Sequence, residues 1–413
     1  MESGRIIASL NNINQFGKLD KGITRLAFSK EDRDAKEYFI SECKKEGLKV
    51  RIDSFGNIIA RREGIDENLA VVAFGSHLDT VVEAGHYDGV VGVVAGLEVV
   101  RRLNSRSYIT QHPLELIVFS CEESSRFNMA TLGSKAMIGH IDENINLLKD
   151  KEGTSIEEVF KQCNLNIFNI GDSKRNSNEI KVFLELHIEQ GPLLENNKNN
   201  IGIVKGIASA TRLAIEVQGQ ASHSGSTPMK DRKDALIGAS EIVVTLEKII
   251  NDEIKDGTLG TIGVMDVSPG VMNVVPGKVE MKVDIRGTSS ESKMYLEQRL
   301  QEEIESIALK RDLLIKSTLL SREESVILNE KIIEQLEFSC KRLKIPYELL
   351  DSGAGHDAMN MGKVFPTGLI FIPSKNGISH NPDEYTSIEH IILGIDLLEE
   401  AIIYWADSDN QIN

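Results

Sequence analysis

Cysteine is scarce in this sequence, and its placement excludes two kinds of small-protein framework. The 413 residues contain four cysteines with no Cys-x-x-Cys pair: Cys43, Cys121, Cys163 and Cys340. A cysteine-rich zinc module needs closely spaced pairs, and a disulfide framework is not expected from such isolated residues. Cys121 stands beside Glu122, as a nucleophile beside a base would. It also ends an apolar segment, where a free cysteine is usually a small buried residue, and we interpret it in that way.

The sequence also lacks long apolar segments. It has no run of about 18 apolar residues, the minimum for a membrane-spanning helix. Its first residues, Met1-Glu-Ser-Gly-Arg, lack the apolar core of a signal peptide. We therefore expect a cytoplasmic protein with no membrane partner.

Positive charge is in deficit, with 47 Lys and Arg against 63 Asp and Glu and a formal net charge of −16. This sign disfavours nucleic acid and anionic membranes as partners. It does not exclude an anionic small molecule, because the charge of a site can oppose the net charge. The length of 413 residues exceeds that of one typical core, so two domains are expected.

Several apolar segments predict buried strands, and each leads directly into histidine or acidic residues. Segment 69–74 is followed by His77 and Asp88, and segment 114–120 by Glu122 and Glu123. Segment 180–186 is followed by His187, and segment 367–372 by His380. In an open α/β sheet, sites form at the carboxyl ends of the strands. Imidazole and carboxylate groups are ligands for zinc, manganese and related ions. Because one zinc site needs only three or four ligands, this set predicts two ions that share a bridging carboxylate.

The pattern of elements changes within residues 209–324. Strands are expected at 211–218, 260–267, 278–285 and near 313–318, with helices at 231–254 and from a Thr288-Ser-Ser-Glu291 capping box to about residue 310. We therefore predict an α/β protein in which residues 1–208 and 325–413 form a central-sheet domain that carries the candidate metal ligands. Residues 209–324 would form an inserted α+β lid domain. Residues 141–180, rich in Asn, Glu and Lys, predict surface helix and loop.

Seven short motifs resemble those of the M20-type metallo-amidohydrolases, in order along the chain. They are Gly75-Ser-His-Leu-Asp-Thr, Tyr87-Asp-Gly, Glu122-Glu-Ser-Ser-Arg-Phe, His187-Ile-Glu-Gln-Gly-Pro, Asp284-Ile-Arg, Gly353-Ala-Gly-His-Asp-Ala and Ile378-Ser-His-Asn-Pro. The sequence is most similar to the hydantoinase/carbamoylase branch, which contains N-carbamoyl-L-amino acid hydrolases, allantoate amidohydrolases and β-ureidopropionases. One departure is Ser124, where several members carry glycine; its effect is open.

The resemblance implies a centre of two divalent ions per subunit, zinc or manganese in the first place and cobalt or nickel as alternatives. His77 and His187 would bind one ion, Glu123 and His380 the other, and Asp88 would bridge the two. Glu122 would be the general base, which takes a proton from a metal-bridging water and later passes it to the leaving nitrogen. Asp79 would support the site by orienting His77.

The resemblance also implies that the central-sheet domain is a metallohydrolase catalytic domain and that the inserted lid domain is also a dimerisation domain. Several of the implied substrate-binding residues lie in the inserted domain. His223 would stabilise the oxyanion across a homodimer interface, and Arg286 would bind a substrate carboxylate through two parallel hydrogen bonds. Further polar contacts would come from Gln190, Arg212, Asn273 and Gly355. His356 lies near the site by its motif, with an open role. His86, His112, His140 and His390 match no motif and are interpreted as structural or surface residues.

These inferences predict a two-metal hydrolase of the carbamoyl C–N bond of N-carbamoyl-L-amino acids, which would release the L-amino acid, CO2 and NH3. Allantoate amidohydrolase activity is the alternative, because both substrates offer a carboxylate and a carbamoyl carbon. A dipeptidase or aminopeptidase of the wider superfamily is a further alternative. A metal-binding protein without activity is a fourth, but such a protein has no use for Glu122.

Overall fold

The computed structural model describes residues 2–142, 144–253 and 257–408, and the chain divides into two compact units. The first unit comprises Met1–Lys205 and Ile327–Asn413, and the second comprises Gly206–Val326. The central sheet of the first unit confirms the predicted α/β class. The predicted function of the second unit, as lid and dimerisation domain, stays a prediction. No helix among the described residues is long and apolar enough to cross a membrane.

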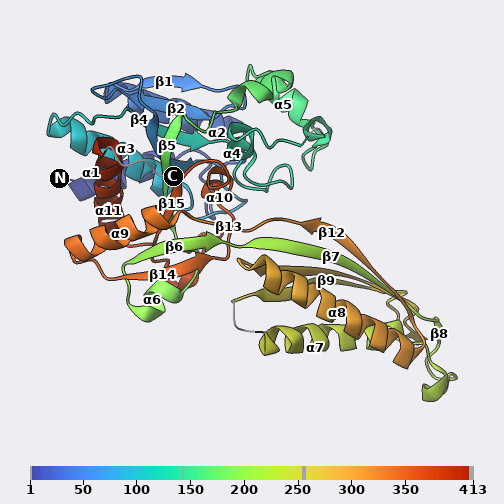
Figure 1. Ribbon diagram of the computed structural model, residues 1–413. Coiled ribbons are helices and arrows are strands. Elements are labelled where there is room, and N and C mark those ends of the chain that lie inside the picture. The colour runs from blue at the N-terminus through green and yellow to red at the C-terminus, as the bar shows by residue number, and fades with distance from the viewer. Residues whose placement is uncertain (1, 143, 254–256, 409–413) are drawn as a thin grey trace. The chain divides into compact units, whose positions relative to one another are not determined.

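The first unit is built on a nine-stranded mixed sheet of order β1-β2-β4-β3-β5-β15-β6-β13, with β14 paired to β6 (Figure 1). Its strands are β1 (Lys49–Ile52), β2 (Ile58–Arg62), β3 (Val71–His77), β4 (Leu114–Phe119), β5 (Ile180–Ile188), β6 (Ile201–Ile207), β13 (Val326–Ile327), β14 (Tyr347–Ser352) and β15 (Thr367–Ile372). The four central strands β4, β3, β5 and β15 run parallel to one another. Their carboxyl ends therefore meet at one edge, where loops can bring polar side chains together.

Helices and short 3-10 turns connect these strands. The elements are α1 (Glu2–Ile13), α2 (Lys30–Lys45), α3 (Val90–Ser105), α4 (Leu132–Met137), η1 (Ile145–Leu147), α5 (Ile156–Gln162), η2 (Ile167–Ser173), α6 (Leu193–Asn197), α9 (Glu330–Leu343), α10 (Asp357–Met361), η5 (Lys375–Gly377) and α11 (Ile388–Asp407). Helix α3 packs on β3 and β5 and against α11, so that nearly all of its side chains are buried. Burial on this scale excludes water from the sheet beneath. It also fixes the start of α3, which begins two residues after Asp88.

Residues 141–180 differ in part from the predicted surface segment. Ile156, Val159 and Phe160 of α5 are buried with Phe28 and Phe55 in a second apolar cluster. The described Asn, Glu and Lys residues of this segment are exposed or half-exposed, and these residue types make up much of its composition. The buried side chains are spaced too irregularly to give a periodic signal.

The second unit is a four-stranded antiparallel sheet of order β12-β7-β11-β9 with two helices packed on one face (Figure 1). Its elements are β7 (Ser209–Gln218), β8 (Ser222–His223), η3 (Met229–Asp231), α7 (Ala235–Asp252), β9 (Leu259–Ser268), β10 (Val274–Val275), β11 (Lys278–Gly287), α8 (Ser290–Arg311) and β12 (Leu314–Arg322). Along β11, buried residues alternate with exposed or half-buried ones, as expected where helices cover one face.

The helix predicted at 231–254 begins later than expected. Helix α7 starts at Ala235 because the Asp234 carboxylate accepts hydrogen bonds from the backbone N–H groups of Leu236 and Ile237. Residues 229–231 form a 3-10 turn instead. The predicted last residue, Ile254, lies outside the described residues.

Candidate metal centre and active site

The candidate site lies at the carboxyl ends of β3, β4 and β5, where the sequence pattern predicted it. His77 is the last residue of β3, His187 is the penultimate residue of β5, and Glu122 and Glu123 follow β4. Asp88 lies in the loop between β3 and α3, directly before the first turn of that helix. The structure therefore brings together side chains that are separated by up to about a hundred residues of sequence.

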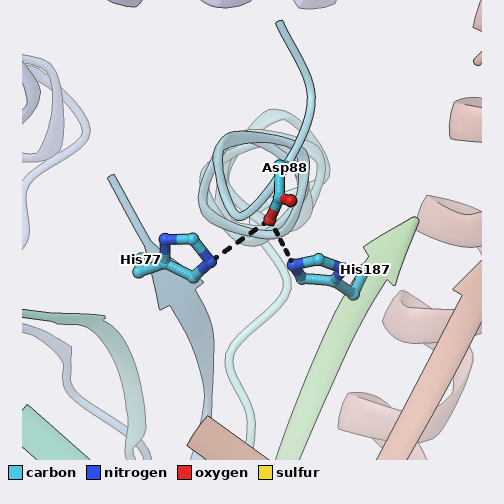
Figure 2. A group of neighbouring side chains, drawn as sticks. All are labelled: His77, Asp88 and His187. Atoms are coloured by element: carbon cyan, nitrogen blue, oxygen red, sulfur yellow. Dashed lines mark ion pairs between the residues drawn. The ribbon is translucent and has the colours of Figure 1, made fainter. Parts of the chain in front are cut away.

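A first group consists of His77, Asp88 and His187, all buried, with exposed fractions of 2%, 6% and 1%. Asp88 Oδ1 lies 3.5 Å from His77 Nε2 and 3.1 Å from His187 Nε2. Figure 2 shows the two imidazoles approaching this oxygen from neighbouring strands. Two imidazole nitrogens and a carboxylate oxygen at these separations form one candidate binding site for a divalent ion.

A second group shares the same aspartate. Asp88 Oδ2 lies 3.1 Å from His380 Nε2, and Glu123 Oε1 lies 3.4 Å from that nitrogen. His380 comes from the loop after β15, and its side chain is half exposed. Each oxygen of Asp88 thus faces one group, which is the arrangement of a bridging carboxylate. The second group lies on the open side of the centre.

The tautomers of the buried histidines fit metal binding. His77 Nδ1 lies 2.9 Å from the Asp79 carbonyl oxygen, and His187 Nδ1 lies 2.9 Å from the Ile188 carbonyl oxygen. A carbonyl can only accept, so each Nδ1 carries a proton, and Nε2, which faces Asp88, is the nitrogen left to bind an ion. The Gly89 N–H also points at His187 Nε2, at 3.1 Å. Two imidazole Nε2 atoms beside a carboxylate, with their rings held by backbone carbonyls, are a ligand set suited to cations.

The electrostatics of the site also favour cations. Burial, with Glu123 and Asp357 nearby, raises the pKa of Glu122 well above its usual value despite the opposing effect of His77. Burial and Asp88 raise the pKa of Glu123 to about 7. Several carboxylates confined away from water destabilise one another when ionised. Divalent cations among them would remove that penalty, so the residues present fit a two-ion centre.

Asp79 links two of the loops that form the site. Its carboxylate accepts hydrogen bonds from the backbone N–H groups of Glu122 (3.2 Å) and Glu123 (3.0 Å). It is the backbone carbonyl of Asp79 that contacts His77, whereas its carboxylate lies 3.9 Å from His77 Nδ1. It is therefore the backbone of Asp79 that contacts the His77 ring. The Asp79 side chain instead holds the backbone of Glu122 and Glu123.

Glu122 is placed beside the first group. Its side chain is buried, and Oε2 lies 3.7 Å from His77 Nε2. The preceding residue, Cys121, is buried in the left-handed backbone region with φ of 59°. Burial raises the pKa of its thiol well above the usual value, which keeps it protonated and supports its interpretation as a structural residue.

Gln190 and the 352–358 segment complete the surroundings within the first unit. Gln190 Nε2 donates to Asp88 Oδ2 at 2.7 Å, so this predicted substrate contact lies at the centre itself. The ring of His356 packs 4.6 Å from that of His187, and its Nε2 lies 3.1 Å from Ser352 Oγ. A Cβ added at Gly355 would meet no neighbouring atom within 4 Å. The backbone of Gly355 is thus accessible to a small molecule.

Two buried glutamates near the site were missed by the sequence reasoning. Glu185 accepts hydrogen bonds from Ser76 Oγ and the Ala358 N–H, both at 2.8 Å. It precedes His187 by two residues on β5, so the strand period could have placed both on one face. Glu384 accepts hydrogen bonds from the backbone of Tyr87 and Asp88. These contacts join Glu384 to a loop almost 300 residues earlier in the chain, and no local sequence pattern indicates such a distant contact.

Within the second unit, the four predicted substrate-binding or oxyanion-stabilising residues form two separate pairs. Strand β8 pairs with β10, and Ser224 N donates to the Asn273 carbonyl at 3.0 Å, which places His223 next to Asn273 on an exposed turn. Arg212 Nε and Arg286 Nε lie 3.1 and 2.9 Å from the carboxylate of Asp284. The Asp284 carboxylate therefore accepts hydrogen bonds from both guanidinium groups on this face of the sheet.

Gly89 lies where a side chain would displace a candidate ligand, which gives a testable prediction. Its φ is 67°, and an added Cβ would lie 2.4 to 2.5 Å from three atoms of the His77 ring. We expect Gly89→Ala to lower the free energy of unfolding by about 1–3 kcal/mol and to weaken Zn²⁺ binding, because the ring must move. Urea unfolding and Zn²⁺ titration measure the two effects. Gly4→Ala is the control: it lies in α1, meets nothing within 4 Å, and should leave Zn²⁺ binding unchanged. Unaltered Zn²⁺ affinity in Gly89→Ala would contradict this placement of His77.

Comparison with known proteins agrees with this geometry. Residues 73–404 match the peptidase family M20/M25/M40. An uncharacterized hydrolase of Haemophilus influenzae is 46% identical, with 93% of this chain and 94% of that protein covered. An N-carbamoyl-L-amino-acid amidohydrolase of a Pseudomonas species is 37% identical (97% and 97% covered), and an allantoate amidohydrolase of Escherichia coli is 35% identical (91% and 91%).

A solved structure supports the same relationship. The hydantoinase/carbamoylase family amidase of Burkholderia multivorans superimposes with a TM-score of 0.91 at 32% identity, over 98% of both chains. The resemblance inferred from the motifs is therefore confirmed across nearly the whole chain. The chain belongs to peptidase family M20/M25/M40, in its hydantoinase/carbamoylase branch, and is a metal-dependent amidohydrolase.

Proposed function

We propose that this enzyme hydrolyses the carbamoyl C–N bond of N-carbamoyl-L-amino acids and releases the L-amino acid, CO2 and NH3. The observation that carries the proposal is the Asp88-centred ligand set with the buried Glu122 beside it. Relatives named as N-carbamoyl-L-amino-acid amidohydrolases support the substrate class. We also propose a cytoplasmic location.

Each side chain of the centre has a distinct proposed task. His77, Asp88 and His187 would hold one ion, and Asp88, Glu123 and His380 the other; zinc or manganese fits these ligands, with cobalt or nickel as alternatives. Ions bound there polarise a carbonyl and make water more acidic. Glu122 accepts a proton from the attacking water and later donates it to the leaving nitrogen. Asp79 keeps Glu122 and Glu123 in place through their backbone N–H groups.

The remaining proposed contacts recognise the substrate. Arg286 binds its carboxylate, with Arg212 beside it on the same sheet face, and Asp284 accepts a hydrogen bond from each guanidinium group. His223 stabilises the oxyanion and Asn273 adds a polar contact. Gln190 and the exposed backbone at Gly355 contribute further contacts in the first unit.

A substrate panel tests the proposal. Ammonia release would be compared for several N-carbamoyl-L-amino acids, allantoate and dipeptides, with Zn²⁺ or Mn²⁺ added. The proposal expects the highest kcat/KM for a carbamoyl amino acid. A preference for allantoate would establish the alternative, which a relative named allantoate amidohydrolase supports. Hydrolysis of dipeptides alone, without ammonia, would refute both.

Arg286 is expected to control the affinity for the substrate carboxylate. Arg286→Gln should lower kcat/KM by about 10- to 100-fold, mainly through KM, because a hydrogen bond to a charged group contributes about 1.5–3 kcal/mol. Steady-state kinetics on an N-carbamoyl amino acid measures the effect. Lys282→Gln is the matched control, since Lys282 is an exposed cation on the same face of β11. An equal loss in both variants would argue for general surface charge instead of a specific contact.

We also propose a homodimer in which His223 serves the partner subunit. A mixture of Glu122→Gln chains and His223→Ala chains should then regain part of the activity that each lacks alone, because one composite site contains both intact residues. His223 is exposed on a short turn, so its replacement should not disturb folding. Activity after co-expression and purification of the mixed dimer is the measurement. The absence of any recovery in a verified mixed dimer would contradict the shared site.

A further inference from the structure

Glu384 joins two loops that carry opposite sides of the candidate centre. Its Oε1 accepts hydrogen bonds from the backbone N–H groups of Tyr87 (2.8 Å) and Asp88 (3.1 Å). Its Oε2 accepts one from Ser379 Oγ at 2.8 Å. The first two contacts hold the loop that ends in Asp88, and the third holds the loop that contains His380.

Ser379 extends this connection to the bridging carboxylate. Its Oγ lies 3.0 Å from Asp88 Oδ2, the oxygen that faces His380. Gln190 Nε2 lies 3.3 Å from the same hydroxyl and 2.7 Å from Asp88 Oδ2. Glu384 is therefore tied to Asp88 twice, through the main chain and through the side chain of Ser379.

The side chain of Glu384 is buried and closely packed. The side chain is 3% exposed. A Cβ added at Gly85 would lie 2.3 Å from Glu384 Cβ and 2.5 Å from its Oε1, so the two loops are in direct contact here. Both oxygens are occupied by hydrogen bonds, which leaves Glu384 suited to support ligands and not to act as one.

We propose that Glu384 is a positioning residue of the metal centre: it fixes the Asp88 loop against the His380 loop and thereby sets the affinity for divalent ions. The inference rests on the proposed function, because it assumes that Asp88 and His380 bind ions. Removal of the carboxylate would leave two buried N–H groups without an acceptor and would free both loops. Outer partners of this kind typically contribute 10- to 100-fold to metal affinity.

The test is competition for Zn²⁺ between a coloured chelator and the full-length, metal-stripped protein. Glu384→Ala should bind Zn²⁺ about 10- to 100-fold more weakly than the unchanged protein. Glu384→Gln should restore most of the affinity, because its amide oxygen can still accept from Tyr87 and Asp88 and its amide group can donate to Ser379 Oγ. If Glu384→Ala is insoluble, Glu384→Asp is used in its place. Its side chain is one methylene shorter, so its carboxylate cannot reach Tyr87, Asp88 and Ser379 together.

Glu115→Ala separates positioning from general stability. Glu115 is also a glutamate with 3% exposure, but it lies at the start of β4, where Arg175 and Arg61 bind it. This variant should lose stability in urea unfolding and keep its Zn²⁺ affinity. Unchanged affinity in Glu384→Ala, or equal losses in Glu115→Ala, would overturn the positioning role alone. Failure of the unchanged protein to bind Zn²⁺ would overturn the proposed two-ion function as well, so the two failures are distinguishable.

Discussion

Glu122→Gln is expected to lower kcat for an N-carbamoyl amino acid by about 10²- to 10⁴-fold, the usual contribution of a general acid–base residue. The amide has nearly the same size as the carboxylate but cannot accept the proton of the attacking water. Glu122 belongs to neither of the two candidate ligand groups that share Asp88, so the variant should still bind two ions per chain. Ammonia release and metal analysis of the same sample measure the two quantities.

A matched control shows whether the loss is specific to the site. Glu115→Gln removes a buried carboxylate at the opposite end of the strand that leads to Glu122. It should retain most of the activity. Substantial turnover by Glu122→Gln with both ions bound would exclude Glu122 as the base.

Asp88→Ala is expected to have the largest effect on metal binding. Asp88 belongs to both candidate groups, and each of its oxygens faces one of them. Its loss should weaken Zn²⁺ binding by more than about 100-fold, because even residues behind the ligands contribute 10- to 100-fold. Zn²⁺ at a hundred times its Kd should add about 2.7 kcal/mol per bound ion to the free energy of unfolding of the unchanged protein and almost nothing to the variant.

Two single-group variants provide the comparison. His187→Ala removes a residue of the first group and His380→Ala a residue of the second, so each should lower the bound metal from two ions to about one. Metal analysis after dialysis gives the stoichiometry of all three variants. If Asp88→Ala keeps one ion as firmly as His380→Ala does, Asp88 does not bridge the two groups.

Much of the α/β unit could be predicted from sequence because its central strands are largely apolar segments. In β3, β4 and β5, burial on both faces imposes such segments, and the polar residues that end them stand out. His77, Glu122 and His187 were found in this way, and the structure brings them together with Asp88. Their proposed roles came from motif resemblance.

Other features could not be predicted, for identifiable physical reasons. The contact between Glu384 and Tyr87 spans 297 positions and involves backbone N–H groups, which leave no trace in side-chain pattern. The pairing of β8 with β10 consists of two residues per strand, too few for a period-2 signal. The start of α7 depended on which of several polar residues, here Asp234, caps the helix.

Asp79 differs from the sequence-based prediction in which of its atoms make the contacts. The resemblance implied that Asp79 orients the His77 imidazole, and it is the backbone carbonyl of Asp79 that contacts this ring. A carbonyl is present at every residue, so sequence cannot indicate which one is used. The carboxylate contacts the loop after β4, which only the fold brings near.

The most direct test of the account is hydrolysis of an N-carbamoyl-L-amino acid by the full-length protein before and after removal of metal. We expect equal amounts of ammonia and free amino acid, loss of both after chelation, and recovery when two equivalents of Zn²⁺ or Mn²⁺ per chain are returned. Turnover that persists in the fully stripped protein, or the absence of ammonia from every ureido substrate in the restored protein, would contradict it.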